Sequence, residues 1–418
     1  MEVLDLAALL LSLAAIFSYI NFRFIKLPTT IGIMLIAMLM SVCMVISGLL
    51  GFEGLHGKAV AVLEGIDFNK ALMHGMLSFL LFAGALHVNL EDLARHKWII
   101  SILATFGVVM STFIVGSLAW VVFWFAGIKL SYIYCLLFGS LIAPTDPIAV
   151  IGILKTAGVS KSLETKITGE SLFNDGVAVV VFLVIMGIAA GGHDVTVKHI
   201  TLLFFEEAIG GVLFGFAIGW LAYLMLKSVD NYQVEVLLTL ALVMGGYALA
   251  HAIHVSGPIA MVVAGILIGN KGRLLAMSER TREHLDSFWE LMDEILNAVL
   301  FLLIGMEVMV LTISGNYLIA GLVMIPVVLI ARFISVGLPV ALMRSIKKFS
   351  PNAVKIMTWS GLRGGISVAL ALSIPGGPGR EAILTVTYII VVFSILVQGL
   401  TIRRLVASTS TENDEKLV

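Results

Sequence analysis

The sequence is poor in charge: 13% of its 418 residues are Asp, Glu, Lys or Arg, whereas 60% are hydrophobic. A soluble domain carries about 25% charged residues, so this composition excludes an ordinary soluble protein. The mean hydropathy of +1.07 instead indicates a chain that crosses a membrane many times. The formal net charge is −1, which gives no reason to expect nucleic acid as a partner.

Cysteine and nucleotide-binding loops are also scarce or missing. The two cysteines, Cys43 and Cys135, fall in apolar stretches, which indicates neither a disulfide framework nor a metal site. No GxxxxGK[ST] loop is present, so we expect no direct ATP drive, no bound cofactor and no enzymatic activity. The polar segment 405–418 is too short for a regulatory domain, and we expect it to be a disordered tail.

Thirteen segments are long and apolar enough to cross the hydrocarbon core, which takes about 20 helical residues. The expected fold class is therefore an all-α polytopic membrane protein. Between the ninth and tenth spans, residues 271–293 are rich in charge and are expected to form a helix on the membrane surface. The thirteen spans are 3–21, 28–50, 70–88, 98–126, 131–154, 166–190, 200–226, 233–252, 257–270, 294–313, 317–342, 353–374 and 380–402.

The distribution of lysine and arginine predicts an orientation. With thirteen spans, 19 of the 26 basic residues fall in one set of loops and 5 in the other, while Arg332 and Arg363 lie within spans. Basic loops stay in the cytoplasm, so we expect an external N-terminus and a cytoplasmic C-terminus in the plasma membrane. Spans four to six and eleven to thirteen cross in opposite senses, and each set has a polar-interrupted middle helix. This pattern favours inverted repeats with two broken, crossing helices.

The most polar interruption is Pro144-Thr145-Asp146-Pro147, in the middle of the fifth span. Proline removes a backbone donor and clashes with the preceding turn, so the tetrapeptide is expected to open the helix. Freed backbone groups are tolerated at membrane depth only inside protein or beside a water-filled cavity. A proline kink used only for packing is the simpler alternative, but it leaves the acid unexplained.

The sixth span carries four polar residues on one helical face. Glu170 and Asn174 are four residues apart, and so are Ser171 and Asp175. A buried carboxylate without a partner is costly, and Arg332 in the eleventh span is the natural partner for Glu170. This structural ion pair would leave Asp175 as the acid that exchanges protons, a task that suits a desolvated carboxylate with solvent access.

A second helix break is expected in the twelfth span, around Gly361, Arg363, Gly364 and Gly365. Glycines there would allow close approach of two backbones. We expect Arg363 to balance either exposed carbonyl ends or Asp146; an arginine that extends to the interface is the alternative. The nine histidines form no pair with the geometry of metal ligands, and we expect them to be structural.

Together these motifs resemble the monovalent cation:proton antiporters, in the branch of the sodium/proton exchangers. PTDP in one span, GESLFNDG in the next, and the later ARFISVGLP and WSGLRGG carry the resemblance, which covers essentially the whole chain. The resemblance implies a homodimer in a lipid membrane that exchanges Na⁺, or Li⁺ or K⁺, for H⁺. The pair Asn174-Asp175 is similar to that of the electroneutral branch, and the short tail resembles compact prokaryotic members.

The resemblance also implies roles for single residues. The aspartate matching Asp175 binds the cation and the proton alternately, and one-for-one exchange follows if no other group changes its protonation. The oxygen ligands implied for the cation are those of Asp175, Asp146, Ser171 and Thr145, with Asn174 beside them.

The implied protomer has a dimerisation domain and a mobile six-helix core that moves as an elevator. Residues 1–97 and 193–313 would form the dimerisation and linker helices, 98–192 and 314–404 the core, and 405–418 the tail.

Two other classes stay open. A cation channel with a carboxylate-lined path predicts conductance without coupled proton flux, and no repeated filter sequence supports it. An intramembrane aspartyl protease would need Asp146 and Asp175 to share a proton, but Asn174 and the Glu170–Arg332 pair suit ion binding better. Within the transport class, a K⁺-preferring antiporter is the alternative.

Overall fold

In the computed structural model, helices are the only regular elements of two or more residues in the part of the chain that the structure describes. This confirms the expected all-α class. Eight helical segments of this part are long and apolar enough to cross a membrane, and three shorter apolar helices accompany them. The count of thirteen crossings stays a prediction. The described residues are 3–50, 68–146, 159–190, 197–312, 314–344 and 352–415, together with 57, 60, 65 and 349.

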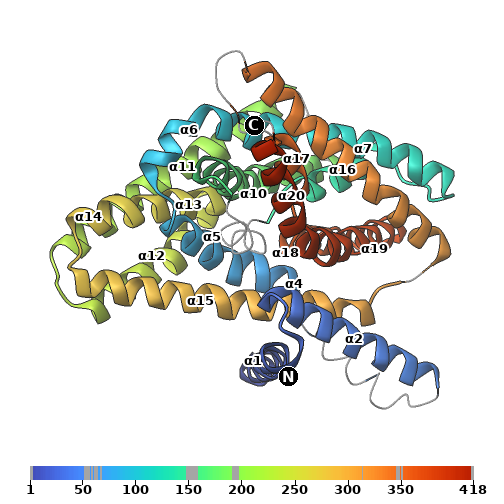
Figure 1. Cartoon of the computed structure of the whole chain (residues 1–418), viewed down its shortest axis with the longest axis horizontal. Coiled ribbons are helices and arrows are strands. Elements are labelled where there is room, and N and C mark those ends of the chain that lie inside the picture. The colour runs from blue at the N-terminus through green and yellow to red at the C-terminus, as the bar shows by residue number, and fades with distance from the viewer. Residues whose placement is uncertain are drawn as a thin grey trace.

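One group of helices surrounds α15, the long helix that crosses the lower part of Figure 1. α15 contacts α2 and α5, and α13 lies against α5 and α11. The large hydrophobic cluster that includes Phe82, Met261 and Trp289 also extends beyond this group, to Leu172 and Met357. This group comprises α1 (Val3–Ile20), η1 (Asn21–Ile25), α2 (Thr29–Leu49), α4 (Phe68–Lys70), η2 (Ala71–Met76), α5 (Leu77–Leu86), α11 (Val197–Lys227), α12 (Tyr232–Ala252), α13 (Gly257–Leu267), η4 (Ile268–Gly272), α14 (Arg273–Leu275), α15 (Glu279–Met306) and η5 (Glu307–Met309).

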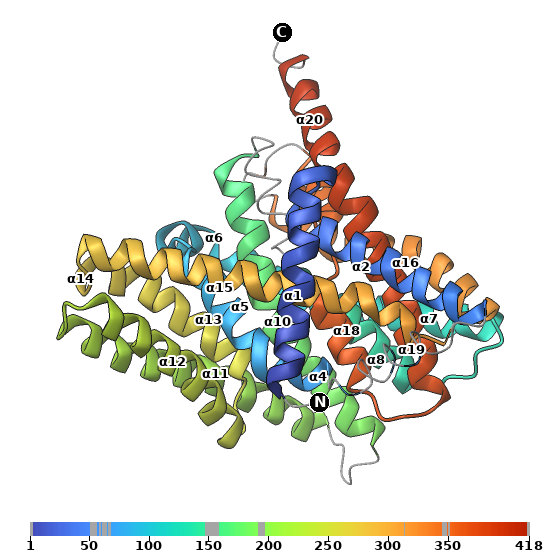
Figure 2. The ribbon, with the colours of Figure 1, turned by 90° about the horizontal axis from the view of Figure 1, so that it is seen from below.

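A second group gathers around α7, α16 and α19, which lie on the right in both overall views (Figures 1 and 2). It has a hydrophobic cluster of its own, with Phe123 and Phe138 fully buried. α7 and α8 pack so closely that a side chain at Gly116 would lie 2.9 Å from the Cys135 carbonyl oxygen. This group comprises α6 (Leu90–Ile102), η3 (Leu103–Gly107), α7 (Val108–Phe125), α8 (Tyr132–Ile142), α10 (Lys161–Ala189), α16 (Gly315–Met343), α17 (Ala353–Trp359), α18 (Gly365–Leu372), α19 (Pro378–Phe393), η6 (Ser394–Gln398) and α20 (Gly399–Glu415).

The two expected helix breaks are present, and they meet. α8 ends just before Pro144, and the twelfth predicted span is divided into α17 and α18. At the crossing, the backbone N–H of Asp146 donates to the carbonyl oxygen of Leu362 at 2.8 Å, an isolated antiparallel bridge. The second proline of the motif, Pro147, lies outside the described residues. Each broken chain therefore satisfies part of the other's freed backbone.

Residues 271–293 were expected to form a helix on the membrane surface, and their place relative to a membrane stays a prediction. Most of this stretch belongs to α15, which runs unbroken for 28 residues. Trp289 is fully buried against Phe82, with ring centroids 4.7 Å apart, and its indole N–H donates to Thr239 at 3.1 Å. The amphipathic pattern is real, and Trp289 on its apolar face packs on protein.

The expected disordered tail is different. α20 continues to Glu415, because extending an existing helix adds one hydrogen bond for each residue fixed. The first turn of α1 and the last turn of α20 lie far apart, toward opposite sides of the molecule in Figure 2.

Candidate functional site

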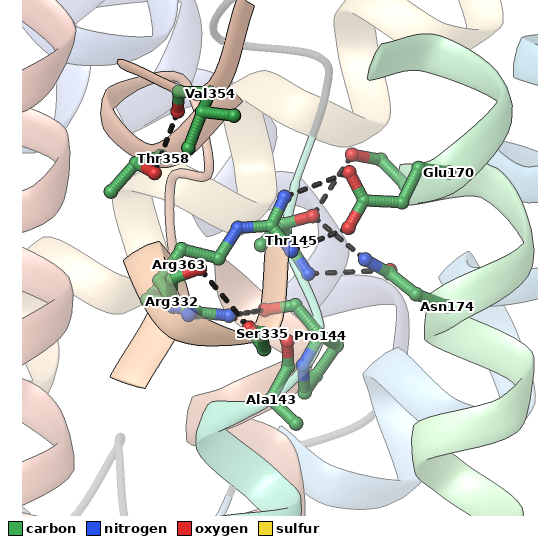
Figure 3. Close-up of polar contacts among 11 residues, drawn as sticks. Ala143, Pro144, Thr145, Glu170, Asn174, Arg332, Ser335, Val354, Thr358 and Arg363 are labelled. Carbon is green, nitrogen blue, oxygen red and sulfur yellow. Dashed lines mark hydrogen bonds and ion pairs between the residues drawn. The ribbon is translucent and has the colours of Figure 1, made fainter. Parts of the chain in front are cut away.

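Glu170 on α10 is paired with Arg332 on α16, the partner expected for it. Both guanidinium Nη atoms donate to the two carboxylate oxygens; Nη2 and Oε2 are 2.8 Å apart (Figure 3). Glu170 is fully buried, and Arg332 is 6% exposed. A two-pronged contact of this kind offsets the desolvation of both charges and ties α10 to α16.

Thr145 in the first break is bonded to two residues of α10 (Figure 3). Its hydroxyl lies 2.9 Å from the Ser171 hydroxyl and accepts a hydrogen bond from the Asn174 amide at 2.8 Å. Its backbone N–H donates to the Asn174 side-chain oxygen at 3.3 Å. All three residues are buried, so this cluster fixes the open chain end against α10.

Arg363 in the second break reaches across to the first. Its Nη1 donates to the carbonyl oxygens of Ala143 and Pro144 at 2.6 and 2.8 Å (Figure 3). These carbonyls follow α8, where no further turn can bond them. Two roles were expected for Arg363. These contacts support the first role, in which Arg363 balances exposed carbonyl ends. Its own backbone N–H donates to the Ser394 hydroxyl at 2.9 Å.

Asp146 and Asp175 share a cavity of about 60 Å³ beside this crossing. Most of its wall is apolar and comes from α5, α10 and α18, with Leu300 of α15. Asp175 is only 5% exposed, and no described residue donates a hydrogen bond to its carboxylate. Two carboxylates in such a small apolar space repel each other when both are ionised, so the cavity favours a cation or a proton.

Gly364 is the residue that lets Asp146 reach this position. A Cβ at Gly364 would lie 2.7 Å from the Cβ of Asp146. Real Cβ atoms do not approach so closely, and a glycine is therefore required at the crossing.

The structure separates the predicted site residues into two sets. Of the residues expected to bind the ion, Asp146 and Asp175 line the cavity. Thr145, Ser171 and Asn174 are not among its described lining residues; they bond to one another beside it. Their role as direct ligands stays a prediction.

Ser367 was missed by the sequence reasoning. It lines the same cavity, is 1% exposed, and its hydroxyl has no hydrogen-bond partner within the described chain. It lies three residues after Gly364, on the face of α18 that meets Asp146. A hydroxyl one turn after a predicted helix break was the available signal, but serine in an apolar helix usually bonds to its own backbone.

Comparison with known proteins agrees with these motifs. The family model described as "Sodium/hydrogen exchanger, transmembrane" matches residues 9–408. The chain is 50% identical to the Na(+)/H(+) antiporter NhaP of Pseudomonas aeruginosa, over 99% of both chains. It is 32% identical to the Na(+)/H(+) antiporter NhaH of Halobacillus dabanensis, over 92% of both.

A solved structure has a similar fold. The sodium proton antiporter MjNhaP1 from Methanocaldococcus jannaschii at pH 8 superposes with a TM-score of 0.76 and 19% identity, over 98% of this chain and 99% of that one. Together with the family match, the motifs and the two crossing breaks lead to one conclusion: the chain is a multi-span membrane protein that belongs to the sodium/hydrogen exchanger family.

Proposed function

We propose that this protein exchanges Na⁺ for H⁺ across a membrane and binds one or the other at Asp175. The observation that carries the proposal is the small cavity shared by Asp175 and Asp146, in which no described residue bonds to the Asp175 carboxylate. Glu170, on the same helix, is already paired with the side chain of Arg332. Asp175 is therefore the acid that is suited to bind a mobile cation. The names of the relatives, which are Na(+)/H(+) antiporters, support the choice of ions.

Competition for a single carboxylate couples the two ions. A proton or a monovalent cation neutralises Asp175, but both cannot do so at once. Because the two loaded forms carry the same charge, one-for-one exchange moves no net charge. The empty carboxylate is costly in apolar surroundings, so it crosses poorly and the cycle does not leak.

The neighbouring residues assist in two ways. Asp146 offers a second carboxylate to the cation, and the hydroxyls of Thr145 and Ser171 are proposed ligands at the edge of the bound ion. Hydrogen bonds between Thr145 and α10 keep that edge in place. The residues proposed to hold the geometry without contacting the ion are Asn174, Glu170, Arg332 and Arg363.

An elevator in which one helix group moves past the other would suit the small cavity, because α5 and α15 of one group and α10 and α18 of the other form its wall. Residues 98–192 and 314–404, related as inverted repeats, would carry the site. Residues 1–97 and 193–313 would form the dimerising scaffold, followed by the tail 405–418. The protein would lie in the plasma membrane with its N-terminus outside and its C-terminus in the cytoplasm, and the wide separation of the first turn of α1 from the last turn of α20 supports this.

The test is exchange in proteoliposomes that contain a pH-sensitive dye and receive a Na⁺ pulse. The wild type should move protons against Na⁺, and Asp175→Asn should abolish the signal, since an amide neither binds a proton nor attracts a cation. Asp230→Asn, the same change at an exposed loop position, is the matched control and should keep wild-type exchange. Sodium-dependent proton movement retained in Asp175→Asn would refute the assignment.

Competition also predicts a pH dependence. As pH falls, protons occupy Asp175, so the apparent KM for Na⁺ should rise, by up to about tenfold per pH unit, while the maximal rate with saturating Na⁺ changes little. Clamping the membrane potential should leave the rate unchanged; a rate that follows potential would contradict electroneutral exchange.

The same vesicles separate the alternatives. Replacing Na⁺ by K⁺ or Li⁺ ranks the cations, and a higher rate with K⁺ would make this a K⁺-preferring antiporter. Conductance without proton flux would instead mark a channel, and cleavage of a membrane peptide would mark a protease.

A further inference from the structure

A second, larger cavity lies along the same helices as the ion site. It measures about 320 Å³ and lies between α10, α18 and the turn that joins α12 to α13. On α10 the first cavity is lined by Leu172 and Asp175, and the second by Val179 and Leu183, which follow on the same face. The second cavity therefore begins one helical turn beyond Asp175.

α18, which faces α10, also lines first one cavity and then the other along its length. On α18 the first cavity is lined by Ile366 and Ser367, and the second by Leu370, with Ser373 just after the helix. Between the two cavities, Gly176 of α10 packs on Ile259 of α13, where an added Cβ would lie 2.7 Å from the isoleucine Cγ1. The two cavities therefore follow one another along α10 and α18.

The far end of the second cavity is polar. Glu207 of α11 is half-buried there, beside His251 and His254, which are exposed. Its place is fixed by the turn: the Ser256 backbone N–H donates to the Glu207 carbonyl oxygen at 3.1 Å, and the Ser256 hydroxyl accepts from the N–H of Ile259 at 3.4 Å as the N-cap of α13. The position of this acid does not depend on a flexible loop.

Few charged groups act on Glu207. A protonated His254 attracts its carboxylate, and the adjacent Glu206, which is exposed and does not line the cavity, repels it. The described lining contains no lysine or arginine. A carboxylate in a narrow space with low-dielectric walls raises the local concentration of cations.

We propose that this second cavity is the ion pathway between Asp175 and the membrane face at the α12–α13 turn, and that Glu207 collects cations at its mouth. With the proposed orientation this is the external face. The inference rests on the proposed function, and it adds a residue on the opposite helix group from Asp175.

The first test compares two neighbouring acids, Glu207→Gln and Glu206→Gln, in right-side-out and everted membrane vesicles at low ionic strength. Glu207→Gln should raise the apparent KM for Na⁺ about threefold to tenfold when Na⁺ is supplied at the cavity face, and leave it unchanged from the other face. Glu206→Gln should match the wild type from both faces. An unchanged KM in Glu207→Gln, or an equal rise from both faces, would overturn the inference.

The second test does not depend on transport. Cys43, which is exposed, is replaced by serine, while the buried Cys135 is kept. Ser373→Cys in this background should react with a membrane-impermeant maleimide from the cavity face alone, and Ser335→Cys, a buried control, should not react. Labelling of Ser373→Cys from the opposite face, or no labelling, would refute the pathway. Loss of Na⁺/H⁺ exchange in the wild type would instead refute the proposed function.

Discussion

Two buried acids on α10, Glu170 and Asp175, occupy opposite environments although little more than one helical turn separates them. Glu170 is fully buried and bonded to both arms of Arg332. Asp175 lines a small cavity with Asp146 and receives no hydrogen bond from a described residue. The difference teaches that a fixed cation makes a membrane-buried acid structural, whereas an acid left without one needs a mobile ion or a proton.

The most direct test of this comparison is to replace each acid by its neutral amide in turn. Glu170→Gln leaves Arg332 as a buried, uncompensated charge, and the free energy of unfolding should fall by about 3–5 kcal/mol. Asp175→Asn removes a buried charge to which no described residue donates a hydrogen bond, so its unfolding temperature should equal or exceed that of the wild type. Thermal unfolding in detergent, followed by tryptophan fluorescence, measures both. Equal destabilisation by the two substitutions would contradict the distinction.

A smaller effect is expected from crowding the cavity rather than changing its charge. In Gly364→Ala the new methyl group meets Asp146, so either the acid or the helix break must shift. Overpacking of this kind costs about 1–3 kcal/mol, and the exchange rate should fall at least tenfold. Gly187→Ala on α10, where an added methyl meets nothing within 4 Å, is the control and should keep both stability and rate. Wild-type exchange by Gly364→Ala would show that the position of Asp146 is unimportant.

The smallest expected effect concerns Ser367, the cavity hydroxyl without a partner in the described chain. If it helps to bind the cation, Ser367→Ala should cost about 0.5–1.5 kcal/mol, or up to about tenfold in the apparent KM for Na⁺, with the maximal rate unchanged. Ser111→Ala, which removes another buried and unpartnered hydroxyl on α7, should have no such effect. A KM equal to that of the wild type would limit the site to the two carboxylates.

Much of the site was predictable because charge is so costly in this chain that each buried ion needs an explanation. Arg332 and Glu170 are 162 positions apart, yet they were paired from their burial alone. Thr145 and Asn174 were also expected together, because the family resemblance implied that both lie at the ion site.

The features that the sequence did not predict depend on the direction in which a side chain points and on the residues that it packs against. The charge pattern of 271–293 indicated a helix, but it did not show that this helix continues through residue 306 or that Trp289 is fully buried. Ser367 and Ser394 look like ordinary serines of apolar helices until the crossing brings a cavity or an arginine N–H to them. The proposed pathway acid Glu207 has no motif, because its significance comes from a cavity formed by several helices that are distant in the sequence.

The bridge between Asp146 and Leu362 is made of main-chain atoms alone. Ordinary side-chain substitutions at either position leave its donor and acceptor intact; only proline at 146 would remove the donor. The carboxylate at position 146 can therefore be exchanged, in the laboratory or in evolution, without removing this bond. At this position the charge of the cavity and the main-chain contact of the crossing can change separately.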